Sequence, residues 1–440
     1  MTASRDAATA TPRAVAERRA AAERILAAAI ARAHPAICLP PRLPAPPADG
    51  RIVVLATGKA GASMAAAAAA HYAQAGVSPE RIVGLAVCRH GYGAEAGPIR
   101  VVEAGHPVPD EAGVAATRET LRLAESAGAD DLVLALISGG GSANWIAPAG
   151  DLTLAEKQAI TKALLRSGAT IGEINCVRKR LSRIKGGRLA ALAAPARLEA
   201  FAISDVPGDD PATIASGPTV PDPTTSADAR AVIAKYALTL PDAARRLLDD
   251  PANETPKPGD PCFARTRFTV IARPAEAIAA AAEAARAEGY EPMVLGADVE
   301  GEARDVARAH ARLALEAKRA GRRVAILSGG ELTVTIRGQG RGGPNQEYAL
   351  ALALALEGTP GIAALSADTD GTDGGRGAAT DPAGAFVDET TPARAATIGL
   401  DAALYLEQND STGFFEALSD LHSPGPTRTN VNDCRIILVD

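Results

Sequence analysis

At least five expected β-strands of this chain end in loops rich in glycine, serine or aspartate. The segments are 53–61 (VVLATGKAG), 134–142 (LALISGGGS), 201–210 (FAISDVPGDD), 325–332 (AILSGGEL) and 364–375 (ALSADTDGTDGG). Short apolar runs alternate with Ala-rich helical patterns, which predicts an α/β fold with a largely parallel sheet. Ligands bind at the carboxyl ends of the strands in such sheets, where glycine lets a phosphate approach the backbone. The loops therefore predict a phosphate-handling cleft.

The chain is long enough for two domains. Its 440 residues exceed the usual size of one compact domain. A proline-rich stretch over 217–261 marks the change of domain. We expect two α/β domains over 1–240 and 241–440 with the cleft between them, and an N-terminal helix over 12–33 that could pack on either.

Charge and composition exclude several classes of protein. Lys and Arg total 46 against 52 Asp and Glu, and aromatic residues make up 3%, so a basic or aromatic nucleic-acid surface is not expected. The five cysteines are scattered without metal-ligand spacing. No signal peptide or membrane-spanning run is recognisable. We expect a cytoplasmic protein that binds small molecules and neither nucleic acid nor membranes; a homo-oligomer is compatible with the sequence.

The turn after the strand at 132–137 is the first candidate site. Ser138, Gly139, Gly140, Gly141 and Ser142 follow that strand directly, and consecutive glycines expose backbone N–H groups that can bind phosphate. The turn fits neither the P-loop pattern nor the dinucleotide GxGxxG pattern. A tight turn without a ligand is the alternative, but the flanking serines favour ATP phosphate binding.

Three isolated cations are candidates for binding anions. Lys59 lies in the first glycine loop, where a lysine can place a compact charge on a phosphate or carboxylate. Lys185 precedes two glycines in the basic run 178–188, most of whose charges are expected on a solvated helix face. Lys185 is the expected exception and could bind the ATP phosphates or the substrate carboxylate. Arg341, in a glycine-punctuated segment, could clamp a carboxylate or phosphate.

The aspartate loops are candidates for metal binding and for proton transfer. Phosphoryl transfer needs Mg²⁺ held by one or two carboxylates and a group that orients the acceptor hydroxyl. Asp205 and Asp373 are the candidates for these two roles, as catalytic residues and as metal ligands. Asn345 and Glu347, in the first turn of a helix that follows Arg341, are candidates for substrate binding.

Taken in order, the motifs resemble the glycerate 2-kinase family whose C-terminal part is the MOFRL domain. They include ATGKAGASM, GHPVPD, LISGGGSA, INCVRKRLSRIKGGRLA, AISDVPGDDPATIASGPTVPDPTT, LSGGELTVTIRGQGRGGPNQEYAL, SADTDGTDG and GPTRTNVNDCRIILV. The resemblance implies ATP-dependent phosphorylation of D-glycerate at the 2-hydroxyl with Mg²⁺, giving 2-phosphoglycerate. It also implies a Rossmann-like N-terminal domain and a catalytic role for Lys59. Many members carry an Arg where this chain has Pro344, and Arg428 replaces a glycine.

Two other functions are compatible with parts of the pattern. Similar proteins have been described as hydroxypyruvate reductases, but an NAD(P)H-dependent reductase should show a GxGxxG loop and a His–carboxylate pair, and neither is recognisable. A non-catalytic regulator that binds a nucleotide or sugar acid would need no pair of carboxylate loops. The kinase is the reading that the residues favour.

Overall fold

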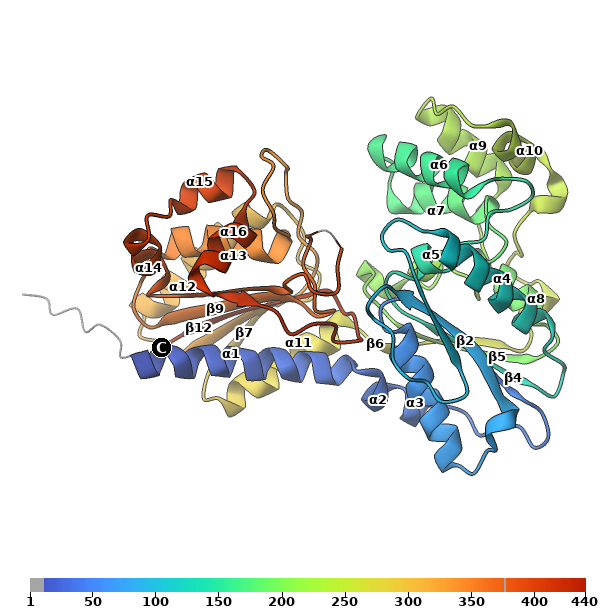
Figure 1. Cartoon of the computed structure of the whole chain (residues 1–440), viewed down its shortest axis with the longest axis horizontal. Helices are drawn as coiled ribbons and strands as arrows, with labels where there is room; N and C mark the ends of the chain where they lie inside the picture. The colour runs from blue at the N-terminus through green and yellow to red at the C-terminus, as the bar shows by residue number, and fades with distance from the viewer. Residues whose placement is uncertain (1–11, 376) are drawn as a thin grey trace, which may run out of the picture. The chain divides into compact units, whose positions relative to one another are not determined.

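The computed structural model describes residues 12–375 and 377–440. It divides into two compact α/β units, each with its own six-stranded sheet (Figure 1). The N-terminal unit consists of residues 33–273 and 428–430, and the C-terminal unit of the described residues up to Arg32, 274–427 and 431–440. Within the described ranges, no helix combines the length and the apolar character needed to cross a membrane.

The N-terminal unit contains the parallel sheet that the sequence predicts. Its strands are β1 (Ile52–Thr57), β2 (Ile82–Arg89), β3 (Arg100–Ala104), β4 (Leu132–Ile137), β5 (Arg197–Ile203) and β6 (Thr266–Ala272), in the order β3-β2-β1-β4-β5-β6. All their pairings are parallel. β1 and β4 are buried along their whole length, which is why both are continuous apolar runs.

Helices cover this sheet and form a separate cluster beside one of its ends. α3 (Gly61–Gln74), α4 (Glu111–Glu125) and α8 (Arg188–Ala193) pack on the strands. The cluster comprises α6 (Leu154–Arg166), α7 (Ile171–Arg180), α9 (Ser226–Lys235) and α10 (Asp242–Asp249). It has its own apolar core, which includes Leu164, Val177, Val232 and Leu248.

The division between the units lies downstream of the expected boundary at 240/241. β6 pairs in parallel with β5, and α10 packs in the core of the helical cluster, so the chain leaves the N-terminal unit only between Arg273 and Pro274. The prolines between 217 and 261 lie inside a unit rather than between two. Proline density does not report which sheet the following strand joins.

The C-terminal unit has a mixed sheet. Its strands are β7 (Glu291–Gly296), β8 (Val324–Ser328), β9 (Ile362–Asp368), β10 (Gly384–Asp388), β11 (Leu421–His422) and β12 (Asp433–Val439), in the order β11-β10-β9-β12-β8-β7. Only β7 and β8 pair in parallel; β12 runs antiparallel between β8 and β9. The helices are α11 (Pro274–Ala287), α12 (Ala303–Arg319), α13 (Pro344–Leu356), α14 (Thr391–Thr397), α15 (Ala402–Glu407) and α16 (Ser411–Leu418).

The N-terminal helix α1 (Pro12–Ala33) packs on the C-terminal unit almost along its whole length. Arg18 donates to Glu389 at 2.7 Å and to Asp440 at 2.9 Å, and its side chain is only 7% exposed. Arg19 pairs with Asp388 and Asp420. These buried ion pairs decide between the two positions that the sequence left open for the helix.

Candidate functional site

Two glycine loops meet at the carboxyl ends of β1 and β4. The strands pair in register, with Thr57 opposite Ile137, so the loops that follow start side by side. The backbone N–H of Lys59 donates to the Gly139 carbonyl at 2.8 Å, and the N–H of Ala60 donates to Ser138 Oγ at 2.9 Å. The Ser138 hydroxyl, buried beneath the turn, therefore joins the two loops.

The glycines of the turn are required by its packing. A Cβ at Gly139 would lie 2.0 Å from Asp205 Oδ2 and 2.2 Å from Asn430 Nδ2. Gly140 has a φ of +85°, in the left-handed region that favours glycine, and its Cβ would lie 3.5 Å from Lys59 Cγ. The following helix α5 (Gly141–Asn144) is a single turn. Backbone N–H groups of Gly139 and Gly140, rather than a long helix dipole, are what this turn offers to an anion, because the N–H of Gly141 donates to the Ser138 carbonyl at 3.1 Å.

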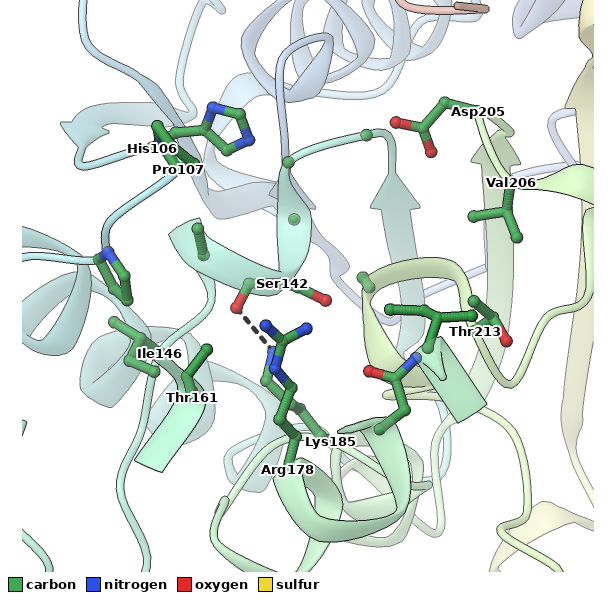
Figure 2. A pocket seen from close by; sticks show the side chains of 18 of the residues that line it. His106, Pro107, Ser142, Ile146, Thr161, Arg178, Lys185, Asp205, Val206 and Thr213 are labelled. Carbon is green, nitrogen blue, oxygen red and sulfur yellow. Dashed lines mark hydrogen bonds between the residues drawn. The ribbon is translucent and has the colours of Figure 1, made fainter. Parts of the chain in front are cut away.

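A cavity of about 300 Å³ opens beside the turn, entirely within the N-terminal unit (Figure 2). His106 and Pro107 line one side of it, and Asp205 lines another. Lys157 from α6, Arg178 from α7 and Lys185 also line the cavity, and Lys185 contacts Ser142. The cavity therefore brings together the glycine turn, one carboxylate and several cations.

Asp205 is oriented by a residue from the far end of the chain. Asn430 Nδ2 donates to Asp205 Oδ2 at 2.8 Å, and the Ser63 hydroxyl, in the first turn of α3, donates to the Arg428 carbonyl at 2.6 Å. Segment 428–430 thus belongs to the N-terminal unit although the residues on both sides of it do not. Sequence reasoning missed Asn430; its only signal was its place in the family motif near the C-terminus.

Ser142 belongs to a hydrogen-bonded chain that leads to α7. Its Oγ lies 2.9 Å from Ser216 Oγ, and Ser216 donates to Asn175 Oδ1 at 3.0 Å. Because Ser216 has a single hydroxyl proton, which it gives to Asn175, Ser142 must donate to Ser216. The lone pairs of the Ser142 oxygen then remain available at the cavity wall.

Lys185 lines the cavity but is engaged with the backbone. Its ammonium donates to the Ser142 carbonyl at 2.9 Å and to the Trp145 carbonyl at 3.2 Å, and the residue is 2% exposed. Burial, with Lys157 and Arg178 nearby, moves the Lys185 pKa well below its usual value. These contacts tie Lys185 to both ends of α5, so it supports the turn from behind.

Arg178 lines the cavity although it was not singled out as a candidate, because most charges of its basic run were expected on a solvated helix face. The structure places its half-buried guanidinium at the cavity, beneath the Ser142 turn (Figure 2). Burial lowers its pKa, and no carboxylate of the described ranges pairs with it. The signal was its spacing: Asn175 and Arg178 are three residues apart on α7, so they share one face.

The predicted residues of the C-terminal part form a different cluster, within the C-terminal unit. The Asp373 carboxylate accepts the backbone N–H groups of Asn345 at 3.1 Å and Gln346 at 2.9 Å, which caps α13. Asn345 also donates to Asp433 at 2.7 Å. Burial and the neighbouring Asp433 raise the pKa of Asp373 to about 7. The buried carboxylate is thus accounted for as a helix cap.

Glu347 and Arg341 lie apart from this pair. The buried Glu347 carboxylate pairs with Arg304, with 2.5 Å between Glu347 Oε1 and Arg304 Nε, and burial raises the pKa of Glu347. Arg341 is exposed, pairs with Glu416 at 2.6 Å and lines a second polar cavity with Asp381 and Thr412. Lys59, the glycine turn, Lys185 and Asp205 therefore share one unit, whereas Arg341, Asn345, Glu347 and Asp373 share the other.

The described residues contain no group of three His, Cys, Asp or Glu side chains that could hold a metal ion by themselves. Mg²⁺ that arrives with a nucleotide needs only one or two carboxylates, because phosphates and water complete its shell. Asp205, at the cavity beside Gly139, fits that donor set. Both oxygens of Asp373 already accept N–H groups, so Asp373 fits it less well.

Comparisons with known proteins identify relatives over nearly the whole chain. Residues 21–249 match the family described as a domain of unknown function, DUF4147, and residues 324–433 match the MOFRL family. A D-glycerate 2-kinase of Thermotoga maritima is 40% identical over 88% of this chain and 91% of that protein. A protein of Agrobacterium vitis, provisionally named hydroxypyruvate reductase, is 48% identical over 94% of this chain and 93% of its own. The crystal structure of a Thermotoga maritima glycerate kinase is 36% identical, covers 97% of this chain and 99% of that one, and superposes with a TM-score of 0.83.

Proposed function

The chain belongs to the family that joins a DUF4147 domain to a MOFRL domain and includes glycerate 2-kinases, and we propose that it is an ATP-dependent D-glycerate 2-kinase. In the proposed reaction, the 2-hydroxyl oxygen of D-glycerate attacks the γ-phosphorus of ATP while the bond from that phosphorus to the bridging oxygen of ADP breaks. The products are 2-phosphoglycerate, ADP and the hydroxyl proton, which is released to solvent. The observation that carries the proposal is a glycine turn, a lysine loop and a carboxylate on one cavity, in a chain that two relatives named as glycerate 2-kinases match over 88% and 89% of its length.

The proposal assigns the phosphates of ATP to the backbone N–H groups of Gly139 and Gly140, because the N–H of Gly141 donates to the Ser138 carbonyl at 3.1 Å. Lys59, whose loop is hydrogen bonded to that turn, neutralises the charge that develops on the transferred phosphoryl group. Asp205 holds the Mg²⁺ that accompanies ATP, in the orientation that Asn430 gives it. When bound, Mg²⁺ supplies electrostatic stabilisation of the phosphates.

The contacts of the remaining predicted site residues indicate whether each one supports the turn or could contact a ligand. Ser138 and Lys185 hold the turn in place from below, since their polar atoms are engaged with the backbone. Roles for Arg341, Asn345, Glu347 and Asp373 in substrate or metal binding stay predictions, because hydrogen bonds and ion pairs within the C-terminal unit account for these side chains.

The decisive experiment supplies the purified protein with ATP, Mg²⁺ and D-glycerate and identifies the product by ³¹P and ¹H NMR. Formation of 2-phosphoglycerate supports the reaction, the donor and the acceptor hydroxyl together. Formation of 3-phosphoglycerate would support a glycerate kinase but refute the assignment of the 2-hydroxyl as the acceptor. No phosphorylated product from folded protein refutes the proposal.

A hydroxypyruvate reductase is the second candidate, favoured by the name of the Agrobacterium vitis relative alone. The loops after β1 and β4 carry TGKAG and SGGGS, and neither has the GxGxxG pattern that lets a dinucleotide pyrophosphate approach the backbone. Oxidation of NADH or NADPH on addition of hydroxypyruvate, followed at the nicotinamide absorbance, would reverse the ranking.

A further inference from the structure

Basic side chains outnumber carboxylates on the wall of the cavity beside the glycine turn. Lys157, Arg178 and Lys185 line it, against the single carboxylate of Asp205. Burial is the main cause that lowers the pKa of both lysines, and the charge of Arg178 lowers it further, so positive charge on all three side chains at once is unfavourable. Both ammonium groups donate to backbone carbonyls, Lys157 to that of Leu181 and Lys185 to those of Ser142 and Trp145. The guanidinium of Arg178 is the cation that remains for a ligand.

Asn175 adds a neutral donor to the wall of the same cavity. Its Oδ1 accepts the Ser216 hydroxyl, which orients the amide so that Nδ2 is turned away from Ser216. Asn175 lines the same cavity, three residues before Arg178 on α7. The capping box of Thr170 and Glu173 sets the start of this helix. A guanidinium and an amide N–H₂ on one rigid helix face can both donate to a single planar carboxylate.

We propose that Arg178 and Asn175 bind the carboxylate of the acceptor and select a small hydroxycarboxylate over a neutral polyol. This inference rests on the proposed function for the identity of the acceptor. It differs in its residues from the expectation that Lys185 or Arg341 holds the carboxylate, because Lys185 is engaged with two carbonyls and Arg341 with Glu416. The Ser142 oxygen, which keeps its lone pairs, is placed to accept the acceptor's 2-hydroxyl proton as a hydrogen bond.

The two ends of the cavity then differ in what they recognise. Asp205 lies beside Gly139, where the proposal puts Mg²⁺ and the nucleotide phosphates. Arg178 lies on the Ser142 side of the same turn (Figure 2). Ile146 and Thr161 also line the cavity. The proposed order along the cavity is therefore carboxylate, hydroxyl and phosphoryl group.

Titration calorimetry tests the proposal, with D-glycerate, glycolate and glycerol as probes and a non-hydrolysable ATP analogue with Mg²⁺ present. The variants are Arg178→Gln, which removes the guanidinium, and Arg178→Lys, which keeps a charge. Arg183→Gln is the matched control, since Arg183 is exposed and outside the cavity. Thermal unfolding checks that every variant is folded.

We expect the wild type to bind both carboxylates and to bind glycerol far more weakly. Loss of a charge-assisted hydrogen bond should weaken D-glycerate binding to Arg178→Gln by roughly 10- to 100-fold. The affinity of Arg178→Lys for D-glycerate should lie between those of the wild type and Arg178→Gln. Arg183→Gln should bind as the wild type does, and the affinity for the ATP analogue should be the same in all variants.

Unchanged D-glycerate binding by folded Arg178→Gln would overturn the inference. So would a loss of affinity for the ATP analogue alone, which would assign the guanidinium to the phosphates. If the wild type binds carboxylates through Arg178 but transfers no phosphoryl group, the carboxylate site is supported and the proposed kinase function is refuted. The two proposals therefore fail in different ways.

Discussion

Asn430 donates a hydrogen bond of 2.8 Å to the carboxylate of Asp205, across 225 positions of sequence. Gly139 packs against this pair so closely that any side chain there would meet both partners. The glycine turn, the carboxylate and a segment from the end of the chain are therefore one packed unit. A change in any of them should affect the other two.

The first prediction concerns Gly139→Ala. The new methyl group would overlap Asp205 Oδ2 and Asn430 Nδ2, so the pair must separate or the turn must move. We expect a loss of stability of about 1–3 kcal/mol, the usual cost of overpacking, together with loss of ATP binding, measured by denaturant unfolding and calorimetry. Gly128→Ala is the control, because its Cβ would meet no atom closer than 4.0 Å. Equal behaviour of the two variants would contradict the tight packing.

The second prediction concerns Lys59→Ala. If Lys59 neutralises charge in the transition state, kcat should fall by roughly 100- to 1,000-fold while the unfolding transition stays in place. Lys162→Ala removes an exposed lysine of α6 and should leave kcat unchanged. Full phosphoryl-transfer activity in Lys59→Ala would remove Lys59 from the proposed mechanism.

The third prediction concerns pH. Burial, with Arg178 and Arg188 nearby, lowers the pKa of Lys157 from 10.5 to about 7, so at pH 8 this amine is largely neutral. An anion bound in the cavity favours the ammonium form and raises that pKa, so D-glycerate binding at pH 8 should take up protons. Below pH 6 Lys157 is already charged, and the uptake should vanish. Calorimetry in buffers of different ionisation enthalpy measures the proton count.

Other titratable groups face the same cavity. Lys185 also has a lowered pKa, and Asp205 and His106 line the walls, so the assignment to Lys157 needs a variant. Lys157→Met should reduce the uptake at pH 8, whereas Lys162→Met, on the same helix, should not. Undiminished uptake in Lys157→Met would assign the proton to another of these groups.

The fourth prediction concerns the anchor of α1. Arg18 and its partner Glu389 are both 7% exposed, so Arg18→Met leaves a buried carboxylate without its cation. Breaking such a pair costs about 3–5 kcal/mol, and we expect the C-terminal unit to unfold at lower denaturant concentration. Arg13→Met removes an exposed arginine of the same helix and serves as the control. Equal stability of the two variants would show that α1 is not held by this pair.

The sequence by itself determined the α/β class, the parallel sheet and the glycine turn. Buried parallel strands such as β1 and β4 must be continuous apolar runs, and a backbone as crowded as that of Gly139 excludes every side chain. These are local requirements, and they leave a direct trace in the residues concerned. Lys59 and Asp205 could be chosen for the same reason, because each follows the end of a strand.

Only the tertiary structure decided which of the chosen side chains are available to a ligand. Lys185 and Arg178 belong to one basic run, yet the first is engaged with two carbonyls and the second faces the cavity. Spacing alone cannot separate them, because the distinction depends on the distant segments packed around each side chain. The position of Asn430 beside Asp205 has the same origin: a hydrogen bond across 225 residues is set by the path of the chain, not by its local pattern.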